Sequence, residues 1–579
     1  MAMRITTKMM QNTALRNLNT CKTREQKLTE QMATGKKISK PSDDPIIAIR
    51  SLKLNSSLDK IMQYSDRNAA DAESWLKLTE SAITTVVDII GGDTGLKHML
   101  TQAAAQYNTA EDRMTIMQDL LNKVKEIYAT GNADSAGKSI FTGFRTDLPL
   151  AFTKEDVAGD GPGKYRITEQ LTNEALGSVT YVKKGDLAEL NEGNFLATDD
   201  ATKDYISQTT EYDVDVYEIP RIRLSYDDLD HVRDTGIKAT YTDAGGNTIV
   251  GKEGINIVEP DVELSFRDKE GNMVTYNINP VYDNTGTRTN GTIKYFNNAT
   301  DTIIDDDGSL CDAYQYALKH ADEAIYVADT GELLLGKDLN ERISELSPTE
   351  EVRVTYEKSN WEEGDLNPIH YFYAEYPREG KDDLIYNKQY LENGKLLPDD
   401  RQIIEYDVGN HQRIRVNTTP DELFTHDIGR DVEELVAALE EYYAISDNLD
   451  TVERMIESGD YFGDDLEKLN SQKAAFEKAK NLINDKIQDS IEDAQTLCDN
   501  WHERANLAAT NNGARSARLE VVKNRLEVQQ TNFEELVSTN EDADYDELTI
   551  QLQSIKLTYN AALSSIAFVM QNSLLDYIR

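Results

Sequence analysis

The sequence is poor in the residues that build covalent frameworks and metal centres. Its 579 residues include only three cysteines and seven histidines. Cys21, Cys311 and Cys498 are odd in number, distant from one another and without any CxxC spacing. This pattern argues against a disulfide framework and against a thiolate zinc site. Because the histidines do not cluster either, we expect neither a metal site nor a cofactor.

Long apolar runs are also missing. No stretch of about 18 apolar residues occurs, so we expect no membrane-spanning helix. Residues 1–28 lack the continuous apolar core of a cleavable signal peptide, because Gln, Asn, Thr and Lys interrupt them throughout. We therefore expect that the chain, if it leaves the cell, uses a route without a cleaved signal.

Positive charge is scarce. The chain has 61 Lys and Arg against 104 Asp and Glu, a formal charge of −43, which argues against nucleic acid and anionic membranes as partners. The balance is uneven, since residues 1–60 hold twelve basic and five acidic residues whereas residues 541–579 hold two and six. The two ends are thus complementary in charge. Exposed pairs contribute only about 0.3–0.5 kcal/mol each, so charge selects partner helices without dominating stability.

The dominant positive feature is apolar spacing of three and four residues near both ends. It runs through residues 519–540, pauses at 541–544 and resumes from Tyr545 to Val569. Residues 11–32 repeat it, ending near Gly35. Such spacing predicts a helix with one narrow apolar stripe, which must be covered by another helix of this chain or of a neighbouring chain.

Two further series predict a helical hairpin. Residues 58–90 and 96–128 carry matching stripes, with Gly91 and Gly92 between them. Before them, Pro41 to Pro45 interrupts the chain, with Asp44 as a helix cap and Pro45 at a first helical position. Residues 519–540 are the candidate third helix of this bundle, which would bring both ends of the chain together.

The middle of the chain alternates as strands do. Residues 262–266 and 274–278 alternate around a turn at 270–272, which predicts an antiparallel hairpin. Shorter alternating runs at 212–216, 222–226 and 352–356 extend the β region. A short likeness between residues 211–223 and 405–415 suggests a duplicated subdomain, and helical patterning returns after about residue 431.

The expected fold is therefore mixed α and β: an elongated helical coiled-coil bundle formed by the N- and C-terminal segments, with a large, mainly antiparallel β insert. The expected domains are an N-terminal assembly helix at 1–44 that pairs with a C-terminal one at 541–579, a helical hairpin at 45–145 completed by 490–540, and an outer insert at 146–489.

Four motifs that suggest chemistry are better explained otherwise. The Gly-Lys-Ser ending of residues 131–139 follows a helix and has Asn132 where a P-loop needs glycine. His502-Glu503 lacks the second histidine of a zinc protease, since Asn506 stands there. Asp305 to Gly308 lacks the ligand spacing of an EF-hand, although weak calcium binding stays open. The aromatic residues Trp75 and 370–376 are more typical of packing pairs than of a sugar-binding face.

Six short motifs stand near the two ends of the chain. They are MRIT at 3–6, QMATGKKI at 31–38, PSDDP at 41–45, ARLE at 517–520, NEDAD at 540–544 and SLLDYI at 573–578. Together they resemble the hook-associated protein 3 family of the flagellin superfamily. IFTGFRTD at 140–147 also resembles that family's loop leaving its helical rod. These regions cover about 200 residues, and within the insert only 405–424 resembles a recurrent outer β segment.

The resemblance implies a structural, non-enzymatic protein of the bacterial flagellum, located outside the cell at the hook-filament junction. It implies self-association in a tubular ring or helical layer, contacts with the preceding hook-associated protein and with flagellin, and an export chaperone. Flagellin itself, or an adhesin whose insert binds glycans, remains an alternative. The predicted subunit-contact residues are Leu18, Leu28, Met32, Leu552, Ile555, Tyr559, Ile566 and Val569.

Overall fold

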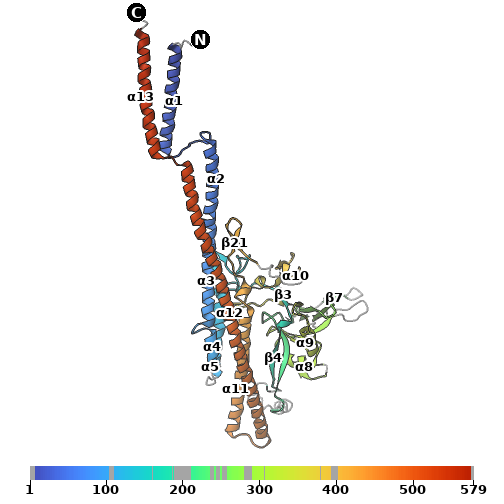
Figure 1. Cartoon of the computed structure of the whole chain (residues 1–579). Coiled ribbons are helices and arrows are strands. Elements are labelled where there is room, and N and C mark those ends of the chain that lie inside the picture. The colour runs from blue at the N-terminus through green and yellow to red at the C-terminus, as the bar shows by residue number, and fades with distance from the viewer. Residues whose placement is uncertain are drawn as a thin grey trace. The chain divides into compact units, whose positions relative to one another are not determined.

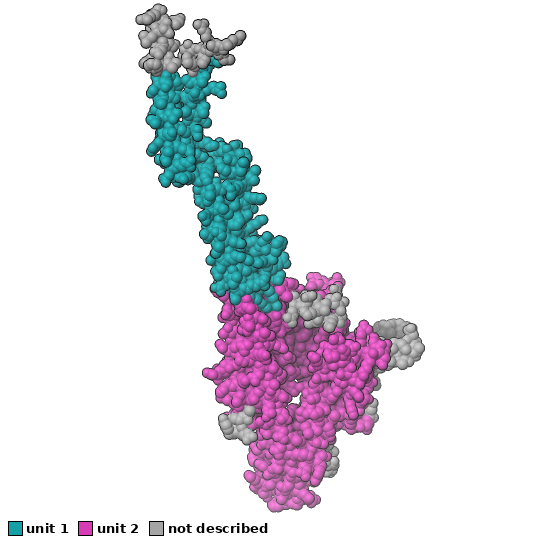
Figure 2. Space-filling model, in the orientation of Figure 1, with its two compact units in different colours: residues 1–74, 405–415, 515–579 teal, residues 75–404, 416–514 magenta. Residues whose placement is uncertain are grey.

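The computed structural model contains two compact units (Figure 2). Unit 1 comprises residues 1–74, 405–415 and 515–579, and unit 2 comprises residues 75–404 and 416–514. The structure describes residues 7–103, 110–159, 161–184, 187, 210–231, 233–234, 240–242, 248–250, 257–279, 290–305, 307–378, 380–392 and 402–575.

Unit 1 is built of helices and one β-hairpin (Figure 1). Helix α1 (Thr7–Thr34) packs along α13 (Tyr545–Leu575). Helix α2 (Pro45–Met62) continues through the π-helical segment η1 (Gln63–Ala69) into α3 (Ala70–Gly91) and lies beside the last part of α12 (Asp464–Glu541). The hairpin of β20 (Glu405–Gly409) and β21 (Gln412–Arg415) packs on η1.

The ends of these helices follow local chemistry that the sequence predicted. Gly35 follows α1 with a φ of 70°, a left-handed conformation that favours glycine. Asp44 caps α2 by accepting from the backbone N–H groups of Ile46 and Ile47 at 2.9 and 3.2 Å. Asp544 caps α13 in the same way. The predicted pause at 541–544 is therefore a capped break between two helices.

The helices of unit 2 form a bundle. They are the rest of α3, α4 (Leu96–Ala103), α5 (Ala110–Thr130), α11 (His426–Ser458) and the first part of α12. The Asn512 amide of α12 donates to the Leu76 carbonyl of α3 at 3.0 Å. The Tyr128 hydroxyl of α5 donates to the carbonyl of Thr425 and accepts from the N–H of Gly429, at 2.7 and 3.0 Å. Buried polar contacts of this kind fix the register between helices.

Unit 2 also contains an eleven-stranded sheet. Its order is β19-β18-β3-β17-β10-β11-β12-β15-β16-β5-β4, and eight of the ten neighbouring pairs are antiparallel. The strands are β3 (Tyr165–Leu171), β4 (Leu176–Lys183), β5 (Asp215–Arg223), β10 (Glu263–Arg267), β11 (Met273–Asn277), β12 (Gly291–Phe296), β15 (Ala324–Val327), β16 (Glu332–Leu335), β17 (Val352–Lys358), β18 (Tyr373–Tyr376) and β19 (Leu384–Tyr386).

Both faces of the sheet are covered at its centre. Along β15, Ala324 and Tyr326 join one apolar cluster, whereas Ile325 and Val327 join another. Because successive side chains of a strand point to opposite faces, this alternation means that β15 is buried on both sides. Trp361 belongs to the first cluster, and the short helix α8 (Ala313–Lys319) contributes to the second.

The remaining described elements are short. They are β1 (Asp134–Ser135), β2 (Lys138–Ser139), β6 (Arg233–Asp234), β7 (Thr240–Thr242), β8 (Thr248–Val250), β9 (Ile257–Val258), β13 (Ile303–Ile304), β14 (Leu310–Cys311), α9 (Lys337–Ser344), α10 (Gln389–Glu392) and the 3-10 turns η2 (Asn173–Ala175), η3 (Pro368–His370) and η5 (Pro420–Glu422). Among the described residues, no helix is both long and apolar enough to cross a membrane.

The predicted fold class is confirmed: helices from both terminal segments accompany a mainly antiparallel β insert. The hairpin predicted from 262–278 is β10 with β11. The run at 212–216 forms strand only from Asp215, because Tyr212 and Asp213 lie in a turn.

The suggested duplication is not supported. Residues 215–223 form the single strand β5 of the large sheet, whereas 405–415 fold back on themselves as β20 and β21. The physical reason is local, since His411 adopts a φ of 57° and closes a tight turn in the second segment. The compact units also depart from the expected boundaries, because this hairpin groups with unit 1 and 75–145 groups with unit 2.

Candidate assembly surface

The terminal helices α1 and α13 form an antiparallel pair within unit 1. The start of α13 meets the end of α1, where Lys36 and Asp542 form an antiparallel bridge. Each helix carries the apolar stripe that its sequence predicted, and burial follows the stripe: Leu28 is 6% exposed and Leu548 is 7% exposed. One stripe therefore covers the other within the chain.

The predicted subunit-contact residues gather along this pair. Leu28 is buried, and six of the other predicted residues are half-buried. The half-buried residues are Leu18, Met32, Leu552, Ile555, Tyr559 and Ile566. Val569 is on α13, but its side chain lies outside the part of the chain that the structure describes. Two helices alone leave much of a stripe accessible, because complete burial of a helix stripe requires neighbours on more than one side.

A polar cluster joins the α1–α13 pair to α2 and α12. The Lys36 ammonium lies 3.1 Å from the Glu541 carboxylate and 2.8 Å from that of Asp542. Glu541 also accepts hydrogen bonds from the Ser51 hydroxyl and from the Asn55 amide. Glu541, at the end of α12, therefore contacts both the segment that follows α1 and helix α2.

The cluster shifts the pKa values of its charged groups. Hydrogen bonds from Ser51, and then from Lys36, lower the pKa of Glu541. The hydrogen bond from Lys36 lowers the pKa of Asp542, and the two carboxylates, Asp542 first, raise the pKa of Lys36. All three groups are thus held in their charged forms around neutral pH.

Gly35 fits this junction sterically as well as conformationally. A Cβ atom built there would lie 3.0 Å from the Tyr545 hydroxyl oxygen. Any side chain would therefore disturb both the left-handed turn and the start of α13. The QMATGKKI motif contains this glycine because α1 must end against α13 at this point.

Other large apolar side chains of unit 1 point away from the helix contacts. On α2, Ile46, Ile49 and Leu52 are 79%, 67% and 71% exposed, and on α13, Ile550 and Leu557 are 68% and 73% exposed. Met9 and Leu15 of α1 are also more than half exposed. Monomeric soluble proteins rarely expose so many apolar side chains together, and such surfaces usually mark contacts with other proteins.

Sequence reasoning missed these outward residues. The stripe pattern identifies only the face that repeats every three and four residues, and Ile550 and Leu557 lie on the opposite face of α13. Their spacing of seven residues was the available signal. A second heptad on one helix indicates that it has two apolar faces.

The motifs that suggested chemistry have structural explanations. The stretch 131–139 forms a turn after α5 followed by the β1–β2 hairpin. Near Asp305, the Asp307 carboxylate accepts from Ser309 and pairs with Lys319. Within the described residues, no three His, Cys, Asp or Glu side chains are close enough to hold a metal ion.

The aromatic residues near 370–376 pack inside unit 2. Tyr371 donates to the Phe424 carbonyl at 2.8 Å, and its ring contacts the ring of His426. Tyr376 packs on Tyr165, whose ring lies edge-on to Trp361. These contacts agree with packing pairs on neighbouring strands.

A known family matches the N-terminal part of the chain. Residues 5–146 match the bacterial flagellin N-terminal helical region. This range contains α1 to α5, the motifs at 31–38 and 41–45, and all but the last residue of the motif at 140–147. The match confirms the resemblance to flagellin-like proteins that these motifs predicted.

Two named relatives are similar over a limited range. Flagellar hook-associated protein 3 of Salmonella typhimurium is 27% identical over 170 residues, which is 29% of this chain and 52% of that protein. Flagellar hook-associated protein 3 of Escherichia coli is 27% identical over 146 residues, 25% of this chain and 45% of that protein. The chain thus spans about half the length of these relatives.

Two solved structures align with most of the chain at low sequence identity. FlgL of Xanthomonas campestris aligns over 84% of this chain and 99% of its own, with 10% identity and a TM-score of 0.26. The flagellar junction protein FlgL of Legionella pneumophila aligns over 81% and 99%, with 12% identity and a TM-score of 0.21. Similarity at this level carries no structural argument.

Proposed function

We propose that this chain is a structural component of the bacterial flagellum, an adaptor at the hook-filament junction on which flagellin polymerises. The match to the flagellin N-terminal helical region supports a flagellin-like structural protein. The similarity to two proteins named flagellar hook-associated protein 3 supports a position at the hook-filament junction. The single observation that carries the mechanism is the α1–α13 pair, which has a partly covered stripe between its helices and further apolar residues on its outer faces.

Neighbouring subunits would cover the apolar surface of α1 and α13 that the monomer leaves accessible. The half-buried residues Leu18, Leu552 and Tyr559 keep accessible surface along the stripe, and Ile550 and Leu557 face outward. In a tubular ring or helical layer, neighbouring copies cover these surfaces and bury apolar area at about 25 cal/mol per Å². The seam residues named from the sequence thus act as subunit-contact residues together with the outward ones.

The proposed partners follow from that position. One rim of the ring contacts the preceding hook-associated protein, and the other presents a flagellin-like surface to the first flagellin layer. An export chaperone covers the terminal stripes before assembly, because exposed apolar helices associate nonspecifically. The chain reaches the outside through the flagellar secretion apparatus. Its role is structural and not enzymatic.

The decisive experiment removes α13. A chain truncated after residue 544 keeps the whole of unit 2, so we expect a soluble protein whose circular dichroism spectrum loses only the helical signal of unit 1. The same truncation uncovers Leu28 and removes half of the assembly surface. We expect it to support no filament growth in cells that lack the native protein.

Normal motility from the truncated chain would contradict the proposal. Antibody labelling of flagella separates the adaptor role from the flagellin alternative. An adaptor labels one band at the boundary between hook and filament, whereas a filament subunit labels the whole length. Labelling along the filament would replace the junction role with that of flagellin.

A further inference from the structure

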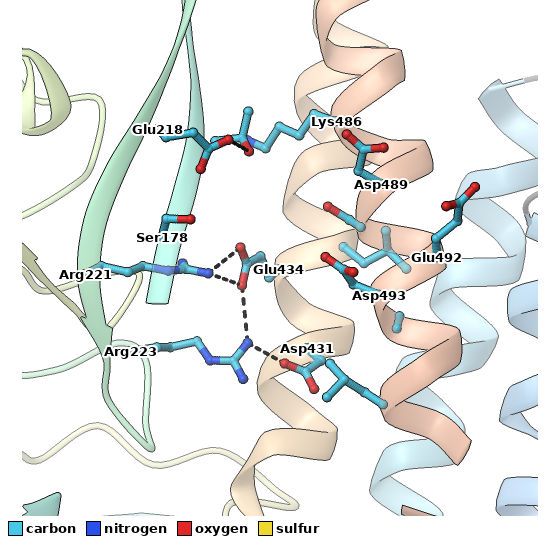
Figure 3. A pocket seen from close by; sticks show the side chains of 15 residues that line it. Ser178, Glu218, Arg221, Arg223, Asp431, Glu434, Lys486, Asp489, Glu492 and Asp493 are labelled. Atoms are coloured by element: carbon cyan, nitrogen blue, oxygen red, sulfur yellow. Dashed lines mark hydrogen bonds and ion pairs between the residues drawn. The ribbon is translucent and has the colours of Figure 1, made fainter. Parts of the chain in front are cut away.

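A polar cavity of about 550 Å³ lies in unit 2, between strands β4 and β5 and helices α11 and α12 (Figure 3). Arg221 of β5 donates to both carboxylate oxygens of Glu434 of α11 at 2.7 Å, and Arg223 pairs with Asp431. These ion pairs connect the sheet to the helix bundle, so the packing of unit 2 accounts for them. The π-helical segment η1 of unit 1 has no such explanation in packing alone.

Segment η1 contains one residue more than an α-helix would need. Ile61, Ser65 and Ala69 are buried, with 9%, 6% and 0% of their surface exposed, so buried positions follow one another at two intervals of four. The alternation of three and four residues that is typical of a helix stripe would bury Met62 in place of Ile61. Met62 is instead 38% exposed. Because a π-turn inserts one residue into an α-helix, η1 shifts the register of α2 by one residue.

This shift decides which of two stripes of α2 faces the rest of unit 1. The inner stripe and the outer stripe differ by one position and are, respectively, Ala48, Ser51 and Ile61, and Ile49, Leu52 and Met62. The outer stripe is the more apolar, since it has isoleucine and leucine where the inner stripe has alanine and serine. Each residue of an α-helix turns the chain by about 100°, so a continuous α-helix would bring the outer stripe inward.

Polar contacts hold α2 in the observed register. The Asn68 amide of η1 donates to the Asp407 carbonyl of the β20–β21 hairpin at 2.7 Å. Near the other end of α2, the Glu541 carboxylate accepts from the Ser51 hydroxyl of the inner stripe. Leu52 in the place of Ser51 would leave Glu541 without this donor, so the contact opposes the change to a continuous α-helix.

The outer stripe of α2 is complementary to another face of the same chain. Residues 45–60 of α2 contain three basic residues and one acidic residue, whereas residues 527–541 of α12 contain four acidic residues and no basic one. Val528 and Leu536 are 62% and 43% exposed on that part of α12. Each copy therefore offers one basic and one acidic face, both with exposed apolar side chains, and two such faces fit head to tail in a closed ring.

We propose that η1 sets the register of α2 so that its more apolar stripe faces outward, where it packs on α12 of a second copy of this chain. The inference rests on the proposed assembly role, because an outward apolar stripe is favourable only when a neighbour covers it. Ile550 and Leu557 of α13 are exposed in the same unit, so the outer stripe extends the proposed assembly surface onto α2.

Deletion of one residue from η1 tests the register in the full chain. Asp66 is an exposed residue of η1, and its deletion should join α2, η1 and α3 into one continuous α-helix. Maleimide labelling of Leu52→Cys should then be at least fivefold slower than in Asp66→Ala, which keeps the length of the segment. Lys53→Cys is the matched control, because position 53 is exposed and stays outward in both registers. Cys21→Ser serves as the background, since Cys311 and Cys498 are buried.

Equal labelling of Leu52→Cys in the deletion variant and in Asp66→Ala would overturn the proposed register. Labelling uses the isolated protein, so this result would leave the proposed function itself intact. Insertion of one alanine after Arg67 in the deletion variant restores the length of η1 and should restore fast labelling. Failure of this insertion to do so would equally contradict the proposal. Thermal unfolding verifies that each variant is folded.

Filament growth in cells that lack the native protein tests the contact made by the outer stripe. Asp66→Ala should support growth, whereas the deletion variant should not. Leu52→Ser keeps the length of η1 and should also abolish growth while its thermal unfolding stays unchanged, because Leu52 is exposed in the monomer. Normal growth from Leu52→Ser, or from a deletion variant whose position 52 is protected, would show that the outer stripe makes no subunit contact.

Discussion

The ammonium group of Lys36 lies 3.1 Å from the carboxylate of Glu541, although the two residues are 505 positions apart in the chain. Lys36 directly follows the turn that ends α1, and Glu541 is the last residue of α12. The pair therefore joins two connections of unit 1, the one between α1 and α2 and the one between α12 and α13. Ser51 and Asn55 of α2 donate to the same carboxylate, so one side chain holds the junction.

Replacing Glu541 with alanine should loosen this junction. Lys36, Ser51 and Asn55 would lose their shared acceptor, and each partly buried donor left unpaired costs about 1 kcal/mol or more. We expect faster amide hydrogen exchange in α1 and α13 with no change in the sheet of unit 2. Glu535→Ala is the control, since Glu535 is an exposed residue of the same helix. Equal exchange in both variants would show that Glu541 does not hold the junction.

The same cluster predicts how the junction responds to acid. The lowered pKa of Glu541 means that its charged form is favoured in the folded chain. Its contribution to stability is therefore complete above its ordinary pKa of 4.5 and is lost as the pH falls through the lower folded value. The protection of the α1 amides against exchange, corrected for the intrinsic pH dependence of amide exchange, should fall below about pH 4.5 in the native chain. In Glu541→Gln this pH dependence should be weaker, and an unchanged profile would assign the effect to other carboxylates.

Local signals predicted a large part of unit 1 and little of the sheet pairing. Spacing of three and four residues identified the helices, and Gly35, Asp44 and the pause at 541–544 identified their ends, because caps and left-handed turns depend on neighbouring residues. Strand pairing depends on distant residues: β17 pairs with β3 across almost two hundred positions. Likewise, nothing near Arg221 in the sequence indicates that it binds Glu434. The inner stripe of α13 was predicted, whereas its second apolar face was missed although Ile550 and Leu557 are spaced seven residues apart.

Substitutions at Leu548 and Leu557 should have different effects, one on the stability of the monomer and the other on its assembly. Leu548 is 7% exposed, so Leu548→Ala removes buried apolar contacts and should lower the stability of unit 1 by about 2 kcal/mol. Leu557 is 73% exposed, so Leu557→Ser should change it by less than about 0.5 kcal/mol. Chemical denaturation measures both. In motility assays, however, Leu557→Ser should fail as the truncated chain does; normal filament growth would remove Leu557 from the subunit contact.

Substitution of Lys358 should strongly lower the stability of unit 2. Its side chain is 1% exposed, its ammonium donates to the Asp227 carbonyl at 2.6 Å, and the Asp365 carboxylate lies 3.7 Å away. Lys358→Met leaves the partly buried carboxylate of Asp365 without this cation and should cost about 3–5 kcal/mol. The double variant Lys358→Met/Asp365→Asn should recover most of that loss. Equal instability of the single and double variants would mean that packing, and not charge, explains the effect.

Asp431 should show the opposite pH dependence from Glu541. Burial raises its pKa from 3.8 to about 6, although Arg223 opposes the shift. Because the folded chain holds this proton more tightly than the unfolded chain, stability falls as the pH rises from about 4 to 6, and the deficit is complete above that range.

Asparagine at position 431 carries no charge, and its amide oxygen can still accept from Arg223. Asp431→Asn should therefore raise the free energy of unfolding at pH 8 by about 1–3 kcal/mol and leave it unchanged near pH 3.5. Thermal unfolding across this pH range measures the difference. A variant that is less stable than the native chain at pH 8 would show that the ion pair with Arg223 outweighs the cost of burial, because that pair is the only favourable term the substitution weakens.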